Sequence, residues 1–392
     1  MTIDCNQVIE RRGTGSAKWE YYPDGVLPMW VADMDFPSPA PVVHALQERA
    51  AHGFFGYSFH APELLEVICA RLERLYQWTV TPEQFVFLPS LVSGIHAVCR
   101  AIGEPGDSVL TMTPAYPPFL SAPAAHQRVC DTFELTRTCH DQTLSYEIDF
   151  AAFADAFHAR TRMLLLCNPH NPVGITYDRT TLARIAELCL SNDTVICSDE
   201  IHCDLLLGEA RHTPMATLSE EIAQRTITLM APSKTFNLPG LGFSMAIVPN
   251  PELREQLKKA SYGIVPHVNA MGLAGALAAY RDGQPWLSEV LTYLTANRDY
   301  YTNYIAEHMP QLAATAPEAT YLGWIDCRAA GIEGSPYKFF LDEAKVALSD
   351  GAMFGPGGEG FVRINFACPR AILDEGLGRM RSALNRIATP VG

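Results

Sequence analysis

The chain has 392 residues, of which 48% are hydrophobic and 18% are charged, and this ordinary globular composition excludes a disordered or fibrous protein. A chain of this length is expected to form about two or three structural units rather than one small module. The 29 Lys and Arg against 43 Asp and Glu give a net charge of -14, and basic residues occur in pairs rather than runs, so we expect neither nucleic acid nor an anionic membrane as a partner.

The first 39 residues are rich in Trp, Pro and Gly and show no clear hydrophobic period. We expect them to form an N-terminal arm that also contributes to a small domain. From residue 40 to residue 283, short apolar runs alternate with longer helical patterns, which predicts one large domain with a mainly parallel seven-stranded sheet flanked by helices. The predicted strands are 85–88, 108–112, 128–133, 163–167, 194–198, 226–230 and 244–248. The predicted helices include 62–78, 93–102, 180–190 and 251–261.

The last part of the chain, 284–392, has a different pattern. A long helical period runs from residue 285 to about residue 309, and two separated strand-like pieces follow at 320–327 and 361–367. Between these two pieces the pattern predicts a helix over 335–348. We therefore expect a smaller C-terminal α+β domain, so that the whole chain belongs to the α/β class.

Cysteine usage and the N-terminus indicate the compartment. The eleven cysteines form an odd set without C-x-x-C spacing, so a disulfide framework is not expected. The N-terminal sequence MTIDCNQVIERRG is charged, and no apolar run reaches the length of about 18 residues that a membrane span requires. These features predict a cytoplasmic protein.

Three further patterns carry no functional prediction. Residues 355–360 match G-x-G-x-x-G, but a strand-like segment follows them instead of a helix. Residues 335–338 match S-x-x-K, and a serine cap followed by proline at the start of a helix explains that match. The twelve histidines include no H-E-x-x-H, so we expect no metal site.

Lys234 differs from the other five lysines, which lie in charged or helical sequence typical of a surface. It follows the predicted strand 226–230 and therefore lies at the carboxyl edge of the predicted sheet, where ligands bind in open α/β folds. A buried lysine loses its proton more easily, and the neutral amine is the form that makes a Schiff base with an aldehyde. An ordinary loop lysine remains the alternative interpretation of Lys234 alone.

Three other segments end at the same predicted edge. Asp199 follows the strand 194–198, Asn171 follows the strand 163–167, and Tyr116 follows the strand 108–112. An acid, an amide, an aromatic ring and a lysine match what pyridoxal phosphate requires: a partner for the pyridine nitrogen, a donor to the ring oxygen, a stacking face and a Schiff-base lysine. For each residue taken singly, the structural interpretation is stronger: Asp199 as a helix cap, Asn171 in a turn and Tyr116 in the core. Their joint order and spacing favour the cofactor site.

The cofactor phosphate requires its own binding site. Ser93, Gly94 and Ile95 open a predicted helix directly after a loop at the sheet edge. The free amides and the positive dipole end of a helix favour an anion. We therefore expect the phosphate at this helix start.

Seven motifs in order give the chain a clear resemblance. It resembles the fold-type I pyridoxal-phosphate enzymes of the class I/II aminotransferase superfamily, and within them the carbon–sulfur β-lyase branch of cystathionine β-lyase and cystalysin type. The motifs are RRGTGSAKW (11–19), LPMWVADMDF (27–36), FGYS (55–58), NPHNPVG (168–174), SDEIHCDL (198–205), SKTFNLPGL (233–241) and VRINFACPR (362–370). The resemblance covers nearly the whole chain.

The resemblance implies a role for individual residues. Lys234, Asp199, Asn171 and Tyr116 take the cofactor roles given above. Arg363 matches the arginine that grips the α-carboxylate of an amino-acid substrate, a task that its bidentate fork suits. The resemblance further assigns to a tyrosine of the FGYS motif a contact with the phosphate of the neighbouring subunit, which implies a homodimer with shared active sites.

That tyrosine is Tyr57. Because it lies in an aromatic stretch, packing inside its own chain remains the alternative.

The chain departs from the aminotransferase pattern at three positions. His202 stands where a tyrosine usually follows the aspartate, Gly242 stands where an arginine often follows the lysine, and Ala231 stands where many relatives have serine. We therefore assign phosphate binding to Ser233, to the helix start at Ser93 and to Tyr57, and count His202 among the cofactor contacts.

The resemblance implies β-elimination from L-cystathionine or related cysteine S-conjugates to a thiol, pyruvate and ammonia. In this reaction Lys234 removes the Cα proton, Asp199 keeps the ring nitrogen protonated, and Tyr116 or Lys234 donates a proton to the leaving sulfur. The same groups also suit transamination, and a pyridoxal-binding regulatory protein acting through a protein partner is a third interpretation. The preferred sulfur substituent is left open by the sequence.

Overall fold

Seven strands form one sheet in the order β2-β10-β9-β8-β7-β3-β4. In this computed structural model, which describes residues 3–388, every neighbouring pair is parallel except those of β10, which is antiparallel to both β2 and β9. All seven predicted strands are present, with bounds within two residues of those expected. The strands are β2 (Phe85–Leu88), β3 (Ser108–Thr113), β4 (Val129–Glu134), β7 (Thr161–Cys167), β8 (Val195–Asp199), β9 (Thr226–Met230) and β10 (Ser244–Ile247).

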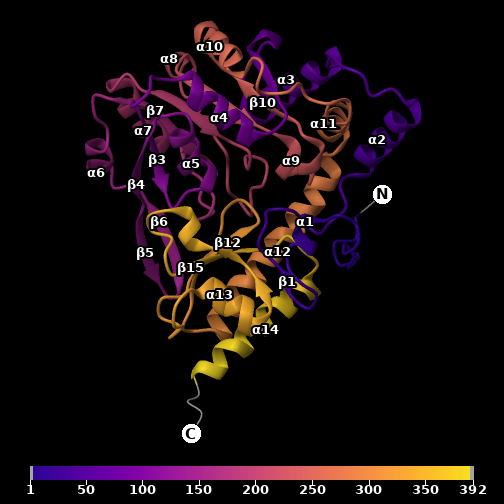
Figure 1. Cartoon of the computed structure of the whole chain (residues 1–392), viewed down its shortest axis with the longest axis vertical. Helices are drawn as coiled ribbons and strands as arrows, with labels where there is room; N and C mark the ends of the chain where they lie inside the picture. Colours follow the sequence, from indigo (N-terminus) through magenta and orange to yellow (C-terminus); the bar gives the residue numbers. More distant parts are fainter. Residues whose placement is uncertain (1–2, 389–392) are drawn as a thin grey trace.

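Helices cover both faces of this sheet (Figure 1), which explains why its strands are apolar runs without alternation. In β7, Met163 and Leu165 pack into the core on one face, and Leu164 and Leu166 pack into the core on the other. The first core includes α4 (Leu91–Ala101), α5 (Pro117–Ala125) and α10 (Pro251–Ser261). The second includes α6 (Phe150–Asp155), α7 (Arg179–Ser191) and α8 (Glu220–Ala223). A third core joins α2 (Ala40–His52), α3 (Pro62–Tyr76) and α11 (Ala270–Asp282) to α12 (Gln284–His308).

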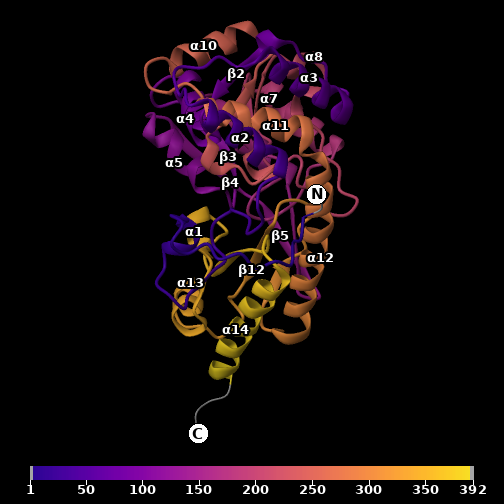
Figure 2. The ribbon, with the colours of Figure 1, turned by 90° about the vertical axis from the view of Figure 1, so that its right-hand side faces the viewer.

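A second sheet of six strands lies in the lower part of the molecule, in the order β14-β15-β12-β11-β6-β5. Helix α12 (Gln284–His308) runs along the side of the molecule from the upper part to the lower part, and α14 (Arg370–Ala388) packs beside it (Figure 2). The C-terminal strands are β11 (Ala313–Thr315), β12 (Leu322–Asp326), β14 (Ser349–Asp350) and β15 (Phe361–Asn365). No helix between residues 3 and 388 combines the length and apolar character that a bilayer span requires.

The hairpin β5 (Thr136–His140) and β6 (Thr143–Glu147) was not predicted, and it joins the six-stranded sheet rather than the seven-stranded one. Its turn residues Asp141 and Gln142 both have positive φ, as in the tight turns that favour hairpins. Leu144 and Tyr146 alternate with exposed residues, so the pattern of one half-buried strand was present in the sequence. The division into arm, large domain and small domain stays a prediction.

The helix predicted over 335–348 is too long, and this prediction was wrong at its end. A short helix α13 (Pro336–Phe339) continues as a wider turn to Ala344, and Lys345 then adopts a left-handed conformation with φ of 56°. The next two residues form β13 (Val346–Ala347), which pairs with β1 (Leu27–Pro28) of the arm. A partner more than 300 residues away in the chain therefore ends the helix.

The arm crosses between the two parts of the molecule and is held by buried ion pairs. Lys18, in the short helix α1 (Ala17–Glu20), is only 1% exposed, and its Nζ lies 2.7 Å from Asp35 Oδ2. Arg11 Nη1 lies 2.7 Å from Asp35 Oδ1, and Trp19 Nε1 donates to the same oxygen at 2.8 Å. The expectation that Lys18 lies at the surface was therefore wrong, because two cations share one buried carboxylate.

Candidate active site

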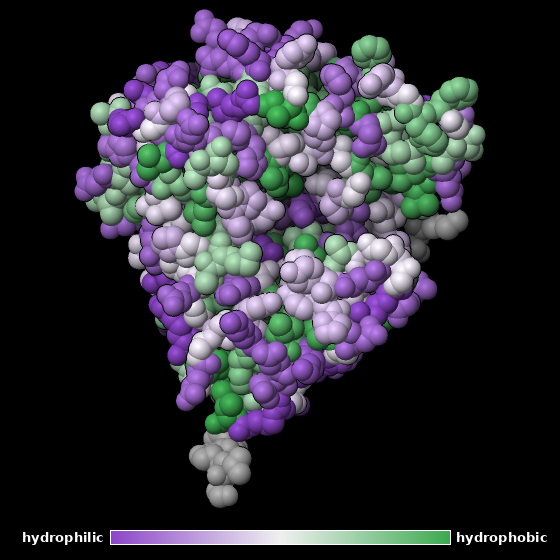
Figure 3. Space-filling view, viewed as in Figure 1, coloured by the Kyte–Doolittle hydropathy of each residue, from purple (hydrophilic) through white to green (hydrophobic). Residues whose placement is uncertain are grey.

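A cavity of about 230 Å³ opens at the carboxyl ends of the central strands, where the surface is hollowed between the two parts of the molecule (Figure 3). Its wall is formed by β7, β8, β15 and helix α4, by the arm, and by the segments that follow β3 and β9. Eight of the eleven predicted site residues line this cavity: Ile95, Tyr116, Asn171, Asp199, His202, Ser233, Lys234 and Arg363. Ser93, Gly94 and Tyr57 do not line it.

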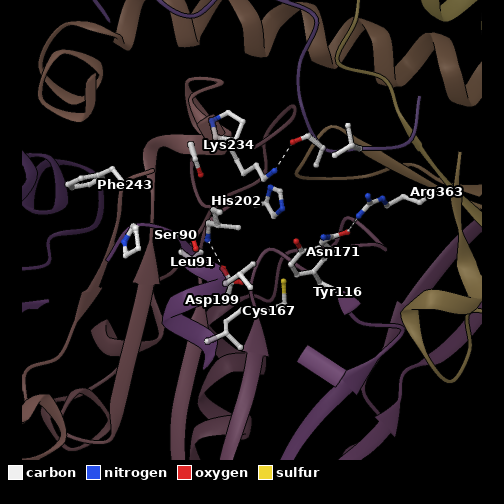
Figure 4. Close-up of a pocket in the computed structure, with 18 residues that line it drawn as sticks. Ser90, Leu91, Tyr116, Cys167, Asn171, Asp199, His202, Lys234, Phe243 and Arg363 are labelled. Atoms are coloured by element: carbon white, nitrogen blue, oxygen red, sulfur yellow. Dashed lines mark hydrogen bonds between the residues drawn. The ribbon is translucent and has the colours of Figure 1, made fainter. Parts of the chain in front are cut away.

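Lys234 lies in the short helix α9 (Pro232–Thr235), directly after β9, and its amine faces the cavity (Figure 4). Its Nζ donates a 2.6 Å hydrogen bond to the main-chain oxygen of Ala32. Burial lowers the pKa of Lys234 from 10.5 to about 8, and the nearby charge of Arg363 acts in the same direction. Near neutral pH the charged form of this amine still predominates, but the uncharged fraction is much larger than that of an ordinary lysine.

Asp199 ends β8 and its side chain lies deeper in the same cavity. The residue is 3% exposed, and its Oδ1 accepts a 3.0 Å hydrogen bond from the amide of Ile201. Burial raises the pKa of Asp199 from 3.8 to about 7, because a carboxylate is costly to desolvate without a strong cationic partner. A protonated ring nitrogen is such a partner.

Arg363 lies in β15, and Asn171 follows β7, yet the two side chains meet in the cavity. Arg363 Nη1 donates to Asn171 Oδ1 at 2.9 Å, and Nη2 donates to Ser349 Oγ at 3.1 Å and to the oxygen of Trp30 at 3.2 Å. Within residues 3–388 no acceptor bonds the buried Arg363 Nε. The guanidinium is thus positioned by three contacts and retains a donor for a carboxylate.

Tyr116 caps the start of α5 and lines the cavity beside these groups. Burial raises the pKa of Tyr116 above its usual value of 10.0, and the Asp199 charge adds to this effect. The phenol therefore keeps its proton at neutral pH.

The amides that face the cavity at α4 start earlier than the sequence indicated. Helix α4 begins at Leu91, and Ser90, Leu91 and Val92 line the cavity. The amide of Ser93 already donates to Ser90 Oγ, and that of Gly94 to the oxygen of Ser90, both at 3.1 Å. In the described part of the chain no acceptor bonds the amides of Leu91 and Val92. These two free amides and the Ser233 hydroxyl suit a phosphate.

Gly94 has a packing role instead. A Cβ atom at this position would lie 3.1 Å from Leu88 Cδ1, so the small residue lets α4 approach β2.

Two residues that depart from the aminotransferase pattern, Gly242 and His202, have distinct local surroundings. Gly242 has a φ of +67°, in the left-handed region that a side chain adopts at a cost, and it lies against the oxygen of Pro89. His202 lines the cavity with its Nδ1 buried and without a hydrogen-bond partner among residues 3–388. Burial lowers the pKa of His202 to about 3, with Lys234 and Arg363 adding to the shift, so the imidazole is neutral.

Tyr57 is not buried, as a residue packed in the core would be. It is fully exposed, and Phe54, Phe55 and Phe59 of the same segment are 72%, 63% and 99% exposed. Apolar side chains gather at this edge of the molecule, next to α2 (Figure 3). The alternative that Tyr57 packs inside its own chain was therefore wrong.

Sequence reasoning missed the contribution of the arm and of two small-domain side chains. The oxygen of Ala32 accepts from Lys234 Nζ and, at 3.1 Å, from the hydroxyl of Tyr321. Ser349 donates to the oxygen of Trp30 at 2.7 Å. The motif 27–36 contains both Trp30 and Ala32, but a main-chain oxygen leaves no signal in residue identity.

The polar groups that line the cavity fit pyridoxal phosphate. Asp199 is a buried acid without a close cation, the Lys234 amine is uncharged in part, and the amides of Leu91 and Val92 are free in the described chain. Lys234 would hold the aldehyde carbon, Asp199 the pyridine nitrogen, and the start of α4 the phosphate. Asn171 and Tyr116, which also line the cavity, would complete the wall around the ring.

Comparisons with known proteins find relatives along nearly the whole chain. The family described as aminotransferase class I and II matches residues 25–380. The cystathionine beta-lyase PatB of Bacillus subtilis strain 168 is 36% identical over 389 residues, which is 96% of this chain and 98% of PatB. The crystal structure of OvoB, at 42% identity, has a TM-score of 0.91 and covers 97% of this chain and 99% of OvoB.

Cystalysin from Treponema denticola, whose structure contains pyridoxal 5'-phosphate, is 30% identical with a TM-score of 0.93. This match covers 98% of the chain and 100% of cystalysin.

Proposed function

The chain belongs to the aminotransferase class I and II family, a pyridoxal-phosphate-dependent family, and on that premise we propose that it is a carbon–sulfur β-lyase acting on L-cystathionine or related cysteine S-conjugates. The products would be a thiol, which is homocysteine from cystathionine, together with pyruvate and ammonia. Relatives that carry carbon–sulfur lyase names at 30–36% identity over nearly the full length support this choice of reaction.

The observation that carries the proposal is the shared cavity of Lys234, Asp199 and Arg363, which approach it from α9, from the end of β8 and from β15. Arg363 binds the substrate α-carboxylate through its fork and fixes the orientation of Cα. Lys234 Nζ, uncharged in part near neutral pH, accepts the Cα proton. When bound, the cofactor supplies the electron sink that takes up the electron pair left on Cα.

Asp199 and Tyr116 hold the two other protons that the reaction needs. The carboxyl of Asp199 shares a proton with the pyridine nitrogen, which is consistent with a pKa raised by burial to about 7. Tyr116 keeps its hydroxyl proton at neutral pH and can donate it to the departing sulfur. A thiol has an unperturbed pKa of about 8.5, so this help need only be modest.

The exposed aromatic segment supports a homodimer with shared active sites. Monomeric proteins rarely expose several large aromatic side chains side by side. Tyr57, exposed beside Phe54, Phe55 and Phe59, is free to contact the cofactor phosphate of a second copy. With Gly242 in place of an arginine, the phosphate has one charged partner fewer in its own subunit. A hydrogen bond from Tyr57 of the neighbouring subunit would compensate for part of this loss.

The decisive experiment offers the purified protein two kinds of substrate. One sample receives L-cystathionine and is assayed for pyruvate and free thiol; the other receives an amino acid with a 2-oxo acid and is assayed for the exchanged pair. Thiol and pyruvate in equal amounts support the lyase. Exchange without thiol release would establish an aminotransferase, and no turnover in either sample would favour a regulatory protein.

A further inference from the structure

Glu200 immediately follows Asp199, but its side chain lies behind the sheet edge rather than in the cavity. Successive residues of an extended strand point to opposite sides, and the amide of Glu200 continues the pairing by donating to the oxygen of Leu229 at 2.9 Å. Asp199 lines the cavity, whereas Glu200 does not. The Glu200 side chain is 0% exposed, and the mechanism above does not use it.

Three donors bond the Glu200 carboxylate. Its Oε1 accepts from Ser198 Oγ at 2.8 Å and from the amide of Met215 at 3.0 Å, and its Oε2 lies 2.8 Å from His212 Nε2. His212 is also 0% exposed. Because its Nδ1 has no partner among residues 3–388, a ring proton at Nε2 satisfies both residues and leaves no buried N–H unpaired. Both oxygens of the Glu200 carboxylate therefore act as acceptors.

The other titratable groups around the pair leave this negative charge uncompensated. Arg71 of α3 lies 2.7 Å from Asp204, so these two charges cancel. The ring of Tyr76 packs edge-on against His212 at 5.5 Å, and burial raises the pKa of this phenol well above its usual value. Burial likewise raises the pKa of the Cys203 thiol, so both groups are neutral.

The charge of Glu200 therefore acts on its neighbour in the chain. Burial is the main cause of the raised pKa of Asp199, and the Glu200 charge acts in the same direction.

We propose that Glu200, held by His212, is a positioning residue that fixes the Asp199 carboxyl from behind the sheet and, through its buried charge, retains the proton that Asp199 shares with the pyridine nitrogen of the bound cofactor. This inference rests on the cofactor-binding role of Asp199 in the proposed function. It does not depend on which reaction follows.

The test replaces Glu200 with Gln in the full chain, because Gln keeps the shape and one acceptor but removes the charge. The matched control is Glu221→Gln, at an exposed position on α8. Pyridoxal phosphate is titrated into the apoprotein, and the visible absorption of the bound cofactor is followed against pH. We expect weaker cofactor binding and a spectral midpoint that moves down by about one pH unit for Glu200→Gln, and no change for Glu221→Gln.

Two further variants complete the test. Ser198→Ala removes one hydrogen bond but leaves the charge, so we expect the wild-type midpoint. His212→Phe removes the donor that holds Oε2, so the Glu200 carboxylate is no longer fixed and the midpoint should shift in the same direction as in Glu200→Gln. If Glu200→Gln does not fold, the result for His212→Phe alone decides whether the inference holds. The inference is overturned if folded Glu200→Gln or folded His212→Phe binds the cofactor with the wild-type affinity and shows the wild-type midpoint. If the midpoint shifts as expected but the wild-type protein shows no lyase turnover, only the proposed function is overturned.

Discussion

The amine of Lys234 donates a hydrogen bond to the main-chain oxygen of Ala32, which lies 202 residues earlier in the chain (Figure 4). The same oxygen accepts from Tyr321 at 3.1 Å, and Asn365 Nδ2 donates to the oxygens of Val31 at 2.7 Å and Asp33 at 2.8 Å. Side chains from α9, from β15 and from the residue before β12 therefore fix the arm segment across the cavity. This fixed oxygen orients the amine toward the place where the aldehyde of the cofactor must lie.

We predict that Lys234→Ala abolishes the visible absorption of the bound cofactor and reduces β-elimination by at least about 10³-fold, since no other lysine lines the cavity among the described residues. The measurements are an absorption spectrum of the reconstituted protein and a pyruvate assay. Lys258→Ala is the matched control, because Lys258 is exposed and pairs with Glu255. Unchanged absorption in Lys234→Ala would remove the assignment.

The lowered pKa of Lys234 has a consequence for the stability of the apoprotein. Below pH 8 this lysine is charged in both the folded and unfolded chain, so folding must bury the charge. Between about pH 8 and pH 10.5 the unfolded chain binds more protons at this site, so the free energy of unfolding rises with pH.

We therefore expect the apoprotein of Lys234→Met to unfold at a higher temperature than the wild type at pH 7, and the difference to shrink from about pH 8 to about pH 10. Thermal unfolding across this range measures it, with Lys258→Met as the control at an exposed lysine. A difference that does not depend on pH would contradict a depressed pKa.

Arg363→Lys tests the recognition of the substrate carboxylate. Lysine keeps the charge but loses the planar fork and cannot reproduce the contacts to Asn171 and Ser349 together. We expect KM for the amino-acid substrate to rise by roughly tenfold or more while the cofactor content stays that of the wild type. Steady-state kinetics with Arg225→Lys as a control, an arginine paired with Asp193 outside the cavity, separates the two effects. Equal KM values in Arg363→Lys and the wild type would refute the assignment.

The proposed dimer is tested by mixing two inactive variants, Tyr57→Ala and Lys234→Ala. If Tyr57 reaches the phosphate of its neighbour while Lys234 acts in its own subunit, a heterodimer has one site with both defects and one site with neither. The mixture should then recover up to about half of the wild-type activity per heterodimer, provided that Tyr57→Ala alone is severely impaired. Confirmed subunit exchange without recovery would show that both residues serve the same subunit's site.

Much of the site was determined by the sequence itself. Buried strands such as Thr161–Cys167 are continuous apolar runs that local pattern identifies, and the polar residues that follow them must lie at one edge of a parallel sheet. For this reason the amino-acid pattern by itself places Lys234, Asp199, Asn171 and Tyr116 together. A set of motifs in chain order also identifies Arg363, although it comes from another sheet.

Tertiary structure alone decided the features that depend on distant partners. The helix after Ser335 ends where Val346 pairs with Leu27, Lys18 is buried because Asp35 receives it, and the amine of Lys234 meets a main-chain oxygen of the arm. In each case the deciding partner is a backbone group or a charge remote in the chain. Local periodicity reports which face of an element is buried, but it contains no information about which segment covers that face.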